Sequence, residues 1–374
     1  MKLTELRWTP YAVPFVAAFT TSERRWSVRA GIVLTMVTDA GVSGVGDVTP
    51  LPSHGTAPHA ALLRALEVIA PRLIGSKITQ GAQVAQELLG NSSRYAPLVC
   101  GIELAACAAE GSAAGVSVAR LLSPHAASSV MVNAVVDAGT CADSTAAAVR
   151  AVRRGFRSVK LKVGLGGCIA DEVARVAALR EAVGPAVRVT LDANGAWTEQ
   201  EAVETLLAVE PYDIGMVEQP VGAGDIGALR RVRDAVRIPV AADESVTGIA
   251  SVRALVGARA VDGVVVKLPV VGGPRSALRI MTIAADAGVA VTVTSALESG
   301  IGIAGALHAA ASLPEPMLAC GLATLDLLED DLILEGLPIR DGQMAVPHLA
   351  GLGVTLDEEA VSRFATGAER VVRA

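Results

Sequence analysis

Charged residues end five consecutive short apolar segments in the middle of the chain. The segments end in Lys160-Leu161-Lys162, Asp192-Ala193-Asn194, Glu218-Gln219-Pro220, Asp243-Glu244-Ser245 and Lys267. A single residue of this kind could simply mark where a buried strand meets water. Five in succession would gather three or four carboxylates at one edge, where like charges at close range cost free energy. We therefore expect a cation among them.

The types of ligand indicate which cation this is. Asp192, Glu218 and Asp243, with Glu244 beside the last, offer only oxygen atoms, and none of the histidines stands at one of these segment ends. Oxygen ligands without His or Cys favour a hard cation such as Mg²⁺, which a few carboxylates bind together with water and substrate. We expect Mg²⁺, with Mn²⁺ able to substitute, and no zinc site.

The lysines are candidates for acid-base chemistry. Lys160 and Lys162 alternate along one predicted strand, so their side chains point to the same face. A lysine beside another cation and partly removed from water can have its pKa lowered towards about 7–8, which makes it a base at neutral pH. Lys267 ends a strand several elements later. We expect Lys162 and Lys267 to flank a substrate.

A repeating pattern of strands and helices must position these residues. From about Met131, short β-branched runs alternate with Ala-rich amphipathic stretches, as in repeated βα units around a parallel sheet. A repeat of about 25–30 residues fits a TIM-type barrel, in which strand ends open into one mouth. The predicted strands are Met131–Val136, Ser158–Lys162, Val187–Asp192, Gly215–Glu218, Val240–Ala242, Gly263–Lys267, Ala290–Thr294 and Met317–Cys320, and the predicted helices are Ala142–Arg154, Asp171–Val183, Glu199–Ala208, Asp225–Val236 and Gly273–Ala287.

The first third of the chain has a different pattern. Val28–Val37 and Val42–Val45 predict an antiparallel hairpin, and Pro58–Ala70 and Leu98–Gly115 predict helices. We expect an α+β capping domain over residues 1–128 and a barrel with the catalytic site over 129–324. The remaining residues, 325–374, are expected to pack back on the capping domain.

Composition argues against several classes of protein. The formal net charge is −6 and no Lys/Arg-rich stripe stands out, so nucleic acid is not an expected partner. Mean hydropathy is +0.48, yet no uncharged apolar run reaches the roughly 18 residues of a membrane span. The first residues lack the pattern of a secretory signal, and the cysteines include no CxxC pair. We expect a cytoplasmic protein that acts on a small molecule.

The five motifs together resemble those of the enolase superfamily, in its muconate lactonizing enzyme subgroup. The resemblance covers nearly the whole chain and implies an α/β fold, with a modified TIM barrel of the (β/α)7β type and an N-terminal α+β capping domain. It implies that Asp192, Glu218 and Asp243 bind the metal. It also implies a small carboxylate substrate that loses its α-proton, and a homo-oligomer.

The resemblance also implies roles for the other residues of the motifs. Lys162 matches the acid-base lysine, and Lys160 matches a residue that helps to lower its pKa and touches the substrate carboxylate. Lys267 matches the lysine on the opposite face of the substrate. Asn194 and Glu244 would supply polar support. A histidine base is not expected, because Ala290–Thr294 and the loop after it contain no histidine.

Two loops resemble those of o-succinylbenzoate synthases, the dehydratases of menaquinone biosynthesis. One is Gly46-Asp47-Val48-Thr49-Pro50-Leu51-Pro52, in which Asp47 stands where glutamate is usual, and the other is Ser295-Ala296-Leu297-Glu298-Ser299-Gly300-Ile301-Gly302. The second loop opens a helix, so backbone N–H groups near Ser299 and Gly300 would suit a substrate carboxylate. Alternatively, Ser299 only caps the helix. Ser295 and Glu298 complete this set of candidate support residues.

The resemblance leaves several reactions open. N-succinylamino acid racemases, dipeptide epimerases and muconate cycloisomerases belong to the same subgroup. Dipeptide epimerases usually present Asp-x-Asp near the last barrel strand, where this chain reads Cys320-Gly321-Leu322. The loops Thr20–Arg25 and Pro50–His54 are expected to shape specificity. We expect dehydration of 2-succinyl-6-hydroxy-2,4-cyclohexadiene-1-carboxylate to o-succinylbenzoate.

Overall fold

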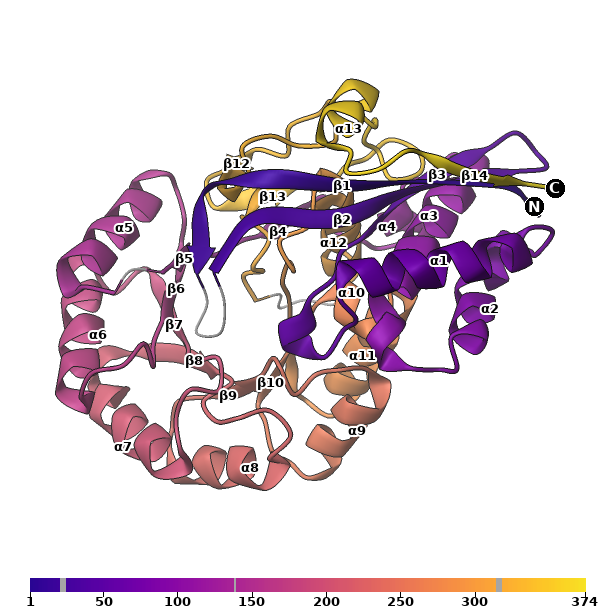
Figure 1. Ribbon diagram of the computed structural model, residues 1–374. Helices are drawn as coiled ribbons and strands as arrows, with labels where there is room; N and C mark the ends of the chain where they lie inside the picture. The colour runs from indigo at the N-terminus through magenta and orange to yellow at the C-terminus, as the bar shows by residue number, and fades with distance from the viewer. Residues whose placement is uncertain (21–24, 138, 314–317) are drawn as a thin grey trace.

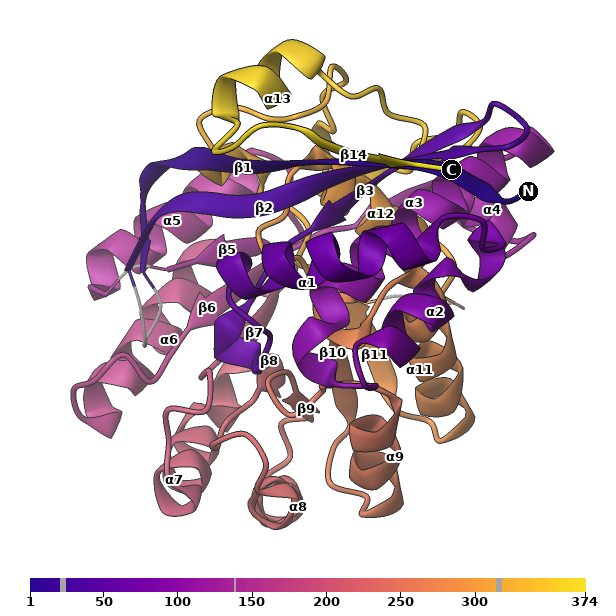
Figure 2. The same cartoon turned by 45° about the vertical axis from the view of Figure 1, so that its right-hand side comes forward.

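The computed structural model describes residues 1–20, 25–137, 139–313 and 318–374, and every structural statement below concerns these residues. A curled parallel sheet forms a barrel, and a separate antiparallel sheet with its helices covers one end of it (Figure 1). The turned view shows the long strands of this cap crossing above the barrel (Figure 2). The predicted fold class, a modified TIM barrel with an N-terminal cap, is confirmed.

The barrel sheet has seven strands in the order β11-β10-β9-β8-β7-β6-β5, so each strand pairs with its neighbour in sequence. Most residues of its strands are buried, as expected of a parallel sheet that is covered on both faces, although Val135 in β5 is 40% exposed. The strands are β5 Ala134–Val136, β6 Ser158–Lys162, β7 Arg188–Asp192, β8 Ile214–Glu218, β9 Val240–Ala242, β10 Gly263–Val266 and β11 Ala290–Val293.

Helices connect the strands around the outside of the barrel (Figure 1). Local signals begin several of them: Thr198 and Glu201 form a reciprocal capping box at α7, and Asp225 caps α8. The helices are α5 Cys141–Arg153, α6 Ile169–Val183, α7 Glu199–Val209, α8 Ile226–Ala235, α9 Ile249–Gly257, α10 Leu268–Val271, α11 Pro274–Asp286 and α12 Gly300–Ala310.

Within the part of the chain that the structure describes, the barrel closes without a regular eighth strand, which corrects the expectation for residues 318–320 of the predicted strand Met317–Cys320. Met317 lies outside the described residues. Cys320 forms a single parallel bridge with Val132, and Gly321 forms one with Thr294. Backbone hydrogen bonds from Asn133 to Cys320 (2.9 Å) and from Ser295 to Gly321 (2.9 Å) complete the closure between β5 and β11.

The predicted first barrel strand, Met131–Val136, is divided between two sheets. β4, Ser129–Met131, pairs with β13, Gln343–Ala345, which pairs in turn with β12, Ile339–Arg340. Only Ala134–Val136 joins the barrel. The chain changes sheets at Val132 and Asn133, whose N–H groups donate to Gly342 and Cys320.

The cap is a four-stranded sheet in the order β14-β1-β2-β3. The predicted hairpin corresponds to β2 and β3, but the long strand β1 was not predicted. The C-terminal β14 pairs with β1, with Glu5 opposite Arg373, so the chain end lies on the cap. The elements are β1 Leu3–Thr20, β2 Arg25–Thr38, β3 Ser43–Val48, β14 Arg370–Arg373, α1 His59–Leu73, α2 Gly81–Leu88, α3 Ala96–Ala114, α4 Val118–Leu122 and α13 Glu358–Phe364.

Helix α3 is the central core helix of the cap. The stretch Ser93–Ala114 is long and apolar enough to cross a membrane, but 83% of its apolar window is buried inside the protein. It lies so close to β3 that a side chain at Gly46 would place its Cβ 2.0 Å from the carbonyl oxygen of Gly101. Burial against the cap sheet therefore explains its apolar composition.

Candidate active site

Strand register brings the predicted residues to one level of the barrel. Lys162 stands opposite Asp192 in the ladder between β6 and β7, and Asp192 stands opposite Glu218 in the ladder between β7 and β8. Asp243 follows β9 and Lys267 follows β10 directly. The sheet thus gathers what we call the strand-end cluster: Lys160, Lys162, Asp192, Glu218, Asp243, Glu244 and Lys267.

Each of the three predicted metal ligands contacts a lysine. Lys160 Nζ lies 2.8 Å from Asp192 Oδ2 and 2.6 Å from Glu218 Oε1. Lys162 Nζ lies 2.7 Å from Asp192 Oδ2, and Lys267 Nζ donates to Asp243 Oδ1. The three carboxylate side chains are at most 3% exposed. The structure therefore brings these predicted site residues together.

The carboxylates dominate the electrostatics of this cluster. Burial disfavours the charged form of Lys160, but Asp192 and Glu218 outweigh it and raise the pKa of that lysine. Likewise Asp243 outweighs burial and raises the pKa of Lys267. These shifts are opposite to the lowering expected for a desolvated lysine. Burial raises the pKa of Glu218 to about 8, because Lys160 offsets the lost hydration only in part.

The donor set fits a divalent cation. The strand-end cluster has four carboxylates against three ammonium groups, which leaves one net negative charge. Burial is the main cause of the raised pKa of Glu218, and the neighbouring charges of Asp192 and Asp243 add to it. Oxygen donors of this kind suit Mg²⁺ or Mn²⁺. Asp192, Glu218 and Asp243 would hold the ion.

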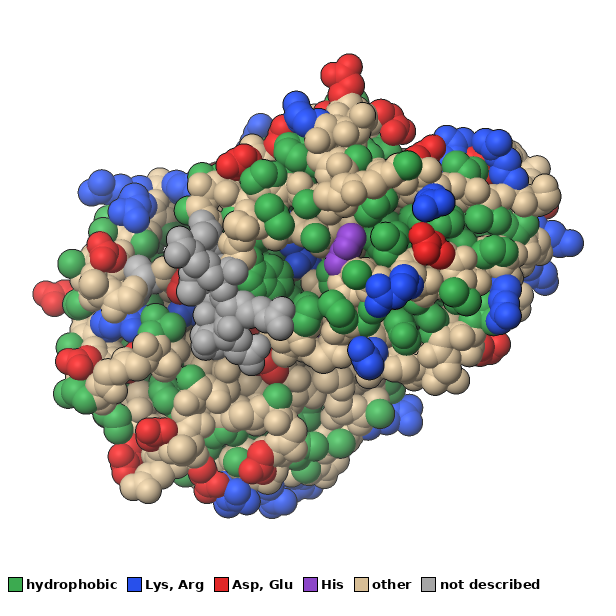
Figure 3. All heavy atoms as spheres, in the orientation of Figure 1, with side chains coloured by type: hydrophobic (Ala, Val, Ile, Leu, Met, Phe, Trp, Pro, Cys, Tyr) green, Lys and Arg blue, Asp and Glu red, His purple; other side chains and the backbone are tan. Residues whose placement is uncertain are grey.

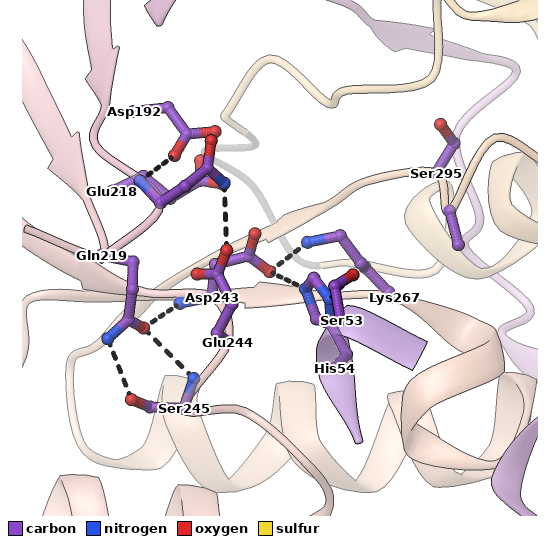
Figure 4. A network of polar contacts seen from close by, with 12 residues as sticks. Ser53, His54, Asp192, Glu218, Gln219, Asp243, Glu244, Ser245, Lys267 and Ser295 are labelled. Atoms are coloured by element: carbon purple, nitrogen blue, oxygen red, sulfur yellow. Dashed lines mark hydrogen bonds and ion pairs between the residues drawn. The ribbon is translucent and has the colours of Figure 1, made fainter. Parts of the chain in front are cut away.

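Amide side chains support the carboxylates. Asn194 Oδ1 accepts from Lys162 Nζ (2.6 Å), and Asn194 Nδ2 donates to Glu244 Oε1 (3.0 Å), so both predicted support residues lie in the network. Gln219 is a further supporting residue, to which the sequence analysis assigned no role. Its Oε1 accepts from the N–H groups of Asp243 (3.0 Å) and Ser245 (3.1 Å) (Figure 4). Gln219 thus ties the end of β8 to that of β9.

A cavity of about 740 Å³ opens above the strand-end cluster. In Figure 3 hydrophobic side chains gather in the hollow between the cap strands and the barrel. The apolar wall includes Trp26, Leu51, Val135, Leu297 and Leu327, while the polar floor includes most of the strand-end cluster. This volume is typical of sites for small molecules, and the mixture suits a substrate with a polar reacting group and an apolar body.

The cap contributes a polar residue that the sequence analysis did not single out. His54, at the end of a 3-10 turn over Pro52–His54, places Nε2 3.4 Å from Asp243 Oδ1 (Figure 4). The specificity loop Pro50–His54 was predicted, and Leu51, Ser53 and His54 do line the cavity. In the other predicted loop, Thr20–Arg25, residues 21–24 lie outside the described residues.

Asp137 is a second cavity residue that was missed. It follows β5 directly and lines the cavity on the side of Lys162, whose charge partly offsets the rise in the pKa of Asp137 that burial causes. The strand-end rule that found Asp192 and Glu218 applies to Asp137 as well. The charged residue that ends a strand was therefore visible in the sequence at β5, one strand before the strand that carries Lys160 and Lys162.

The predicted anion site at Ser299 and Gly300 requires a correction. Ser299 N–H donates to Asp47 Oδ2 (3.2 Å), and Gly300 N–H donates to Asp331 Oδ1 (2.7 Å). The Ser299 side chain also donates to Asp47 (2.8 Å) and makes no capping hydrogen bond to its own helix. The Ser299 donors therefore join the barrel to the cap, the Gly300 donor joins it to the C-terminal segment, and neither is free for a substrate. Ser295, by contrast, lines the cavity.

Asp47 and Glu298 belong to what we call the junction cluster: Tyr11, Arg29, Asp47, Glu298 and Ser299. Tyr11 Oη donates to Asp47 Oδ1 (2.9 Å), and Glu298 Oε2 accepts from Ala296 N–H (2.6 Å). All five residues are at most 2% exposed. Burial raises the pKa of Glu298 to about 7. None of the five lines the cavity, whereas Ser295 on the same loop as Glu298 does.

Family models match both parts of the chain. The N-terminal domain model of the mandelate racemase and muconate lactonizing enzyme family matches residues 2–123. The enolase C-terminal domain-like model matches residues 143–360, which is more than half of the chain. The two matches coincide with the cap and with the barrel and its C-terminal extension.

Individual relatives have several different activities. An o-succinylbenzoate synthase of Thermobifida fusca is 42% identical over 179 residues, which are 48% of this chain and 55% of that protein. The match thus spans about half the length of that relative. A chloromuconate cycloisomerase of Cupriavidus pinatubonensis is 32% identical over 302 residues, 79% of this chain and 80% of that protein.

A solved structure agrees over the whole length. A dipeptide epimerase of Cytophaga hutchinsonii, complexed with Mg and the dipeptide D-Ala-L-Val, superposes with a TM-score of 0.90 at 26% identity and 100% coverage of both chains. Fold, strand-end motifs and both domain matches agree. This chain is therefore an enzyme of the enolase superfamily, whose members use Mg²⁺, and belongs to the mandelate racemase and muconate lactonizing enzyme family.

Proposed function

We propose that this enzyme is an o-succinylbenzoate synthase, a lyase that removes water from 2-succinyl-6-hydroxy-2,4-cyclohexadiene-1-carboxylate in cytoplasmic menaquinone biosynthesis. One observation carries the choice within the family. Where dipeptide epimerases present a carboxylate pair, the cavity wall of this chain is Gly321, between the fully buried Cys320 and Leu322. The described residues of this wall thus offer no carboxylate pair to bind a substrate ammonium, and the Thermobifida fusca relative supports the same choice.

Lys162 removes the proton α to the substrate carboxylate. This breaks a C–H bond and leaves an enediolate, a step to which a positioned acid-base group typically contributes about 10²–10⁴-fold. Asp192, Glu218 and Asp243 would hold Mg²⁺, which when bound would supply positive charge against the developing negative charge of the substrate carboxylate. The protonated Lys162 then gives its proton to the departing hydroxyl, so that water leaves and the ring becomes aromatic.

Lys267 stabilises the intermediate from the other side. It follows β10, four strands from β6 in the sheet order, so the two lysines approach the cavity from different sides. An ammonium group there attracts the anionic intermediate directly, and it attracts the developing aromatic face through a cation–π contact. The apolar wall with Trp26 and Leu297 receives the ring.

The same pair of lysines favours a second candidate, an N-succinylamino acid racemase. Proton removal by one lysine and return by the other would invert the α-carbon. Under this alternative, Lys162 and Lys267 carry equal roles for the two enantiomers. No hydroxyl leaves, and no aromatic product forms.

A direct comparison of substrates tests the proposal. Purified protein with Mg²⁺ is assayed on the cyclohexadiene acid, on N-succinyl amino acids, on cis,cis-muconate and on L-Ala-L-Glu. We expect dehydration to have the highest kcat/KM, by at least about tenfold, which corresponds to about 1.4 kcal/mol in the barrier. Measurable racemisation without dehydration would overturn the assignment in favour of the second candidate.

A further inference from the structure

The cap loop that reaches the barrel is held in one conformation. Arg29 Nη2 donates to the carbonyl oxygen of Pro50 (2.9 Å), and Thr56 Oγ1 accepts from Leu51 N–H (2.8 Å). Gly55 ends the 3-10 turn with φ +77, a left-handed conformation that glycine adopts without strain. Residues 50–56 therefore present His54 at a defined place.

The loop is also packed against the barrel. Leu51 of the cap forms a buried apolar cluster with Val270 of α10 and Ala296 of the loop after β11, with Trp26 against it. The His54 side chain is only 8% exposed as a result. It therefore faces the strand-end cluster and not bulk water.

A hydroxyl on the same turn orients the imidazole. Ser53 Oγ lies 3.2 Å from His54 Nδ1, and His54 Nε2 lies 3.4 Å from Asp243 Oδ1. If the Ser53 hydroxyl donates to Nδ1, then Nε2 carries the proton and donates to Asp243. This tautomer satisfies both contacts (Figure 4).

Among the described residues, Asp243 is the predicted metal ligand that touches the cap. The side-chain partners of Asp192 and Glu218 in the structure, Lys160 and Lys162, come from the barrel. Asp243 receives Lys267 from the barrel and His54 from the cap. A carboxylate that binds a metal is tuned by the groups that hydrogen-bond to it, and loss of such a group typically weakens metal binding about 10–100-fold.

We propose that His54 is a positioning residue that orients Asp243 from outside the coordination sphere and so couples the cap to divalent-metal binding in the barrel. The inference rests on metal binding by the strand-end cluster but not on which reaction of the family the enzyme catalyses. Because coupling is reciprocal, a bound metal also stabilises the packed conformation of residues 50–56 described above.

Metal affinity in the absence of substrate tests this directly. Metal-free protein is titrated with Mg²⁺ by calorimetry. His54→Leu, which removes the donor, should raise Kd about tenfold, whereas His54→Gln, which keeps an N–H donor, should stay within about threefold of the unsubstituted protein. Ser53→Ala, at an exposed position, should raise Kd by about threefold, because the imidazole loses its orienting contact.

His59 provides a matched control. It lies on the same domain, and its Nε2 contacts the carbonyl oxygen of Gly31 (3.0 Å) within the cap. His59→Leu therefore removes a comparable imidazole and should leave Kd for Mg²⁺ unchanged. A rise in Kd for His59→Leu equal to that for His54→Leu would mean that general loosening of the cap explains both, and would overturn the proposal.

Hydrogen exchange provides a second readout. Mg²⁺ should slow amide exchange in residues 51–57 of the unsubstituted protein, but not in His54→Leu. If His54→Leu and the unsubstituted protein have equal Kd values for Mg²⁺ and equal amide exchange, the role of His54 is overturned but the proposed function is not. An unsubstituted protein that binds no Mg²⁺ would overturn this inference and the proposed mechanism together. Electron spin-echo spectroscopy of the Mn²⁺-loaded protein detects nitrogen atoms that are bonded to the metal. A ¹⁴N coupling from a directly bonded imidazole would contradict the proposal that His54 lies outside the coordination sphere.

Discussion

The strand-end cluster and the junction cluster both bury several carboxylates, yet they differ in what holds them. In the strand-end cluster, flexible lysine side chains pair with Asp192, Glu218 and Asp243, and the group faces a cavity of about 740 Å³. In the junction cluster, backbone N–H groups and hydroxyls hold Asp47 and Glu298 away from that cavity. Lysine side chains beside a cavity can exchange protons with a substrate. Backbone N–H groups and hydroxyls in a buried contact instead hold the cap and the barrel together.

Burial of carboxylates alone is therefore no guide to function. Glu298 and Glu218 are each 2% exposed, and burial raises the pKa of both. They differ in surroundings: Glu218 is paired with Lys160, whereas Glu298 Oε1 has no hydrogen-bond partner among the described residues. The following variants test this distinction.

Lys162→Ala should have the largest effect. Loss of the acid-base group should lower kcat by about 10³-fold, and loss of its ion pair with the buried Asp192 should lower the free energy of unfolding by about 1–3 kcal/mol. Steady-state kinetics and urea unfolding measure the two quantities, with Lys77→Ala on the cap as the control. Activity within about tenfold of the unsubstituted enzyme would remove Lys162 from its assigned role.

Lys267→Ala separates the two candidate reactions. In dehydration Lys267 only stabilises the intermediate, so kcat should fall by about 10²-fold. In racemisation it must exchange a proton with the α-carbon. Deuterium exchange at the α-carbon of N-succinyl amino acids, measured by NMR for each enantiomer, should then be lost for one enantiomer only. Equal loss for both enantiomers would contradict this division of roles.

Glu298→Gln should change stability and leave chemistry nearly intact. The folded-state pKa of about 7 lies above the ordinary glutamate value of 4.5, so the folded protein binds an extra proton between these pH values. The stabilisation is present below pH 4.5 and is lost as pH rises through 7. The free energy of unfolding should fall by up to about 3 kcal/mol more in the unsubstituted protein than in the variant between pH 4.5 and 8. Denaturant titrations at each pH measure this difference. If the free energy of unfolding changes with pH equally in the unsubstituted protein and in Glu298→Gln, the carboxyl of Glu298 is not the source of the pH dependence.

Ser299→Ala should have the smallest effect. It removes the hydroxyl that donates to Asp47 but leaves the backbone donor in place. The free energy of unfolding should drop by about 1–2 kcal/mol, with kcat and KM within about twofold. A large rise in KM with unchanged stability would instead restore the predicted substrate contact at Ser299.

The barrel residues were predictable because their signals are local. A period-2 strand that ends in a charge identifies Lys162, Asp192 and Glu218 without knowledge of distant contacts. His54 was not predictable in this way, because its partner Asp243 lies 189 residues later and the contact depends on how the cap sits on the barrel. The same reason explains the error at Ser299, whose N–H group appears free until Asp47 of the cap is placed beside it.

The structural predictions show the same division. Strands β6 to β11 are short, mostly apolar segments that recur at regular intervals, and they were placed within a residue or two. The prediction of an eighth strand was wrong for the described residues, because the barrel closes there through single bridges at Cys320 and Gly321. Single bridges leave no periodic pattern in the sequence. Strand β1 contains Pro10 and Pro14, residues that disfavour strands, and pairing with β2 and β14 overrides that preference.

Calorimetric titration of the metal-free protein with Mg²⁺ tests the central claim most directly, with Glu218→Gln and Glu298→Gln compared side by side. Both variants neutralise a buried glutamate of equal exposure, one in each cluster. We predict one bound ion per chain, a Kd raised at least about tenfold by Glu218→Gln, and no change with Glu298→Gln. Equal affinity in Glu218→Gln and the unsubstituted protein would contradict the assignment of the metal to the strand-end cluster.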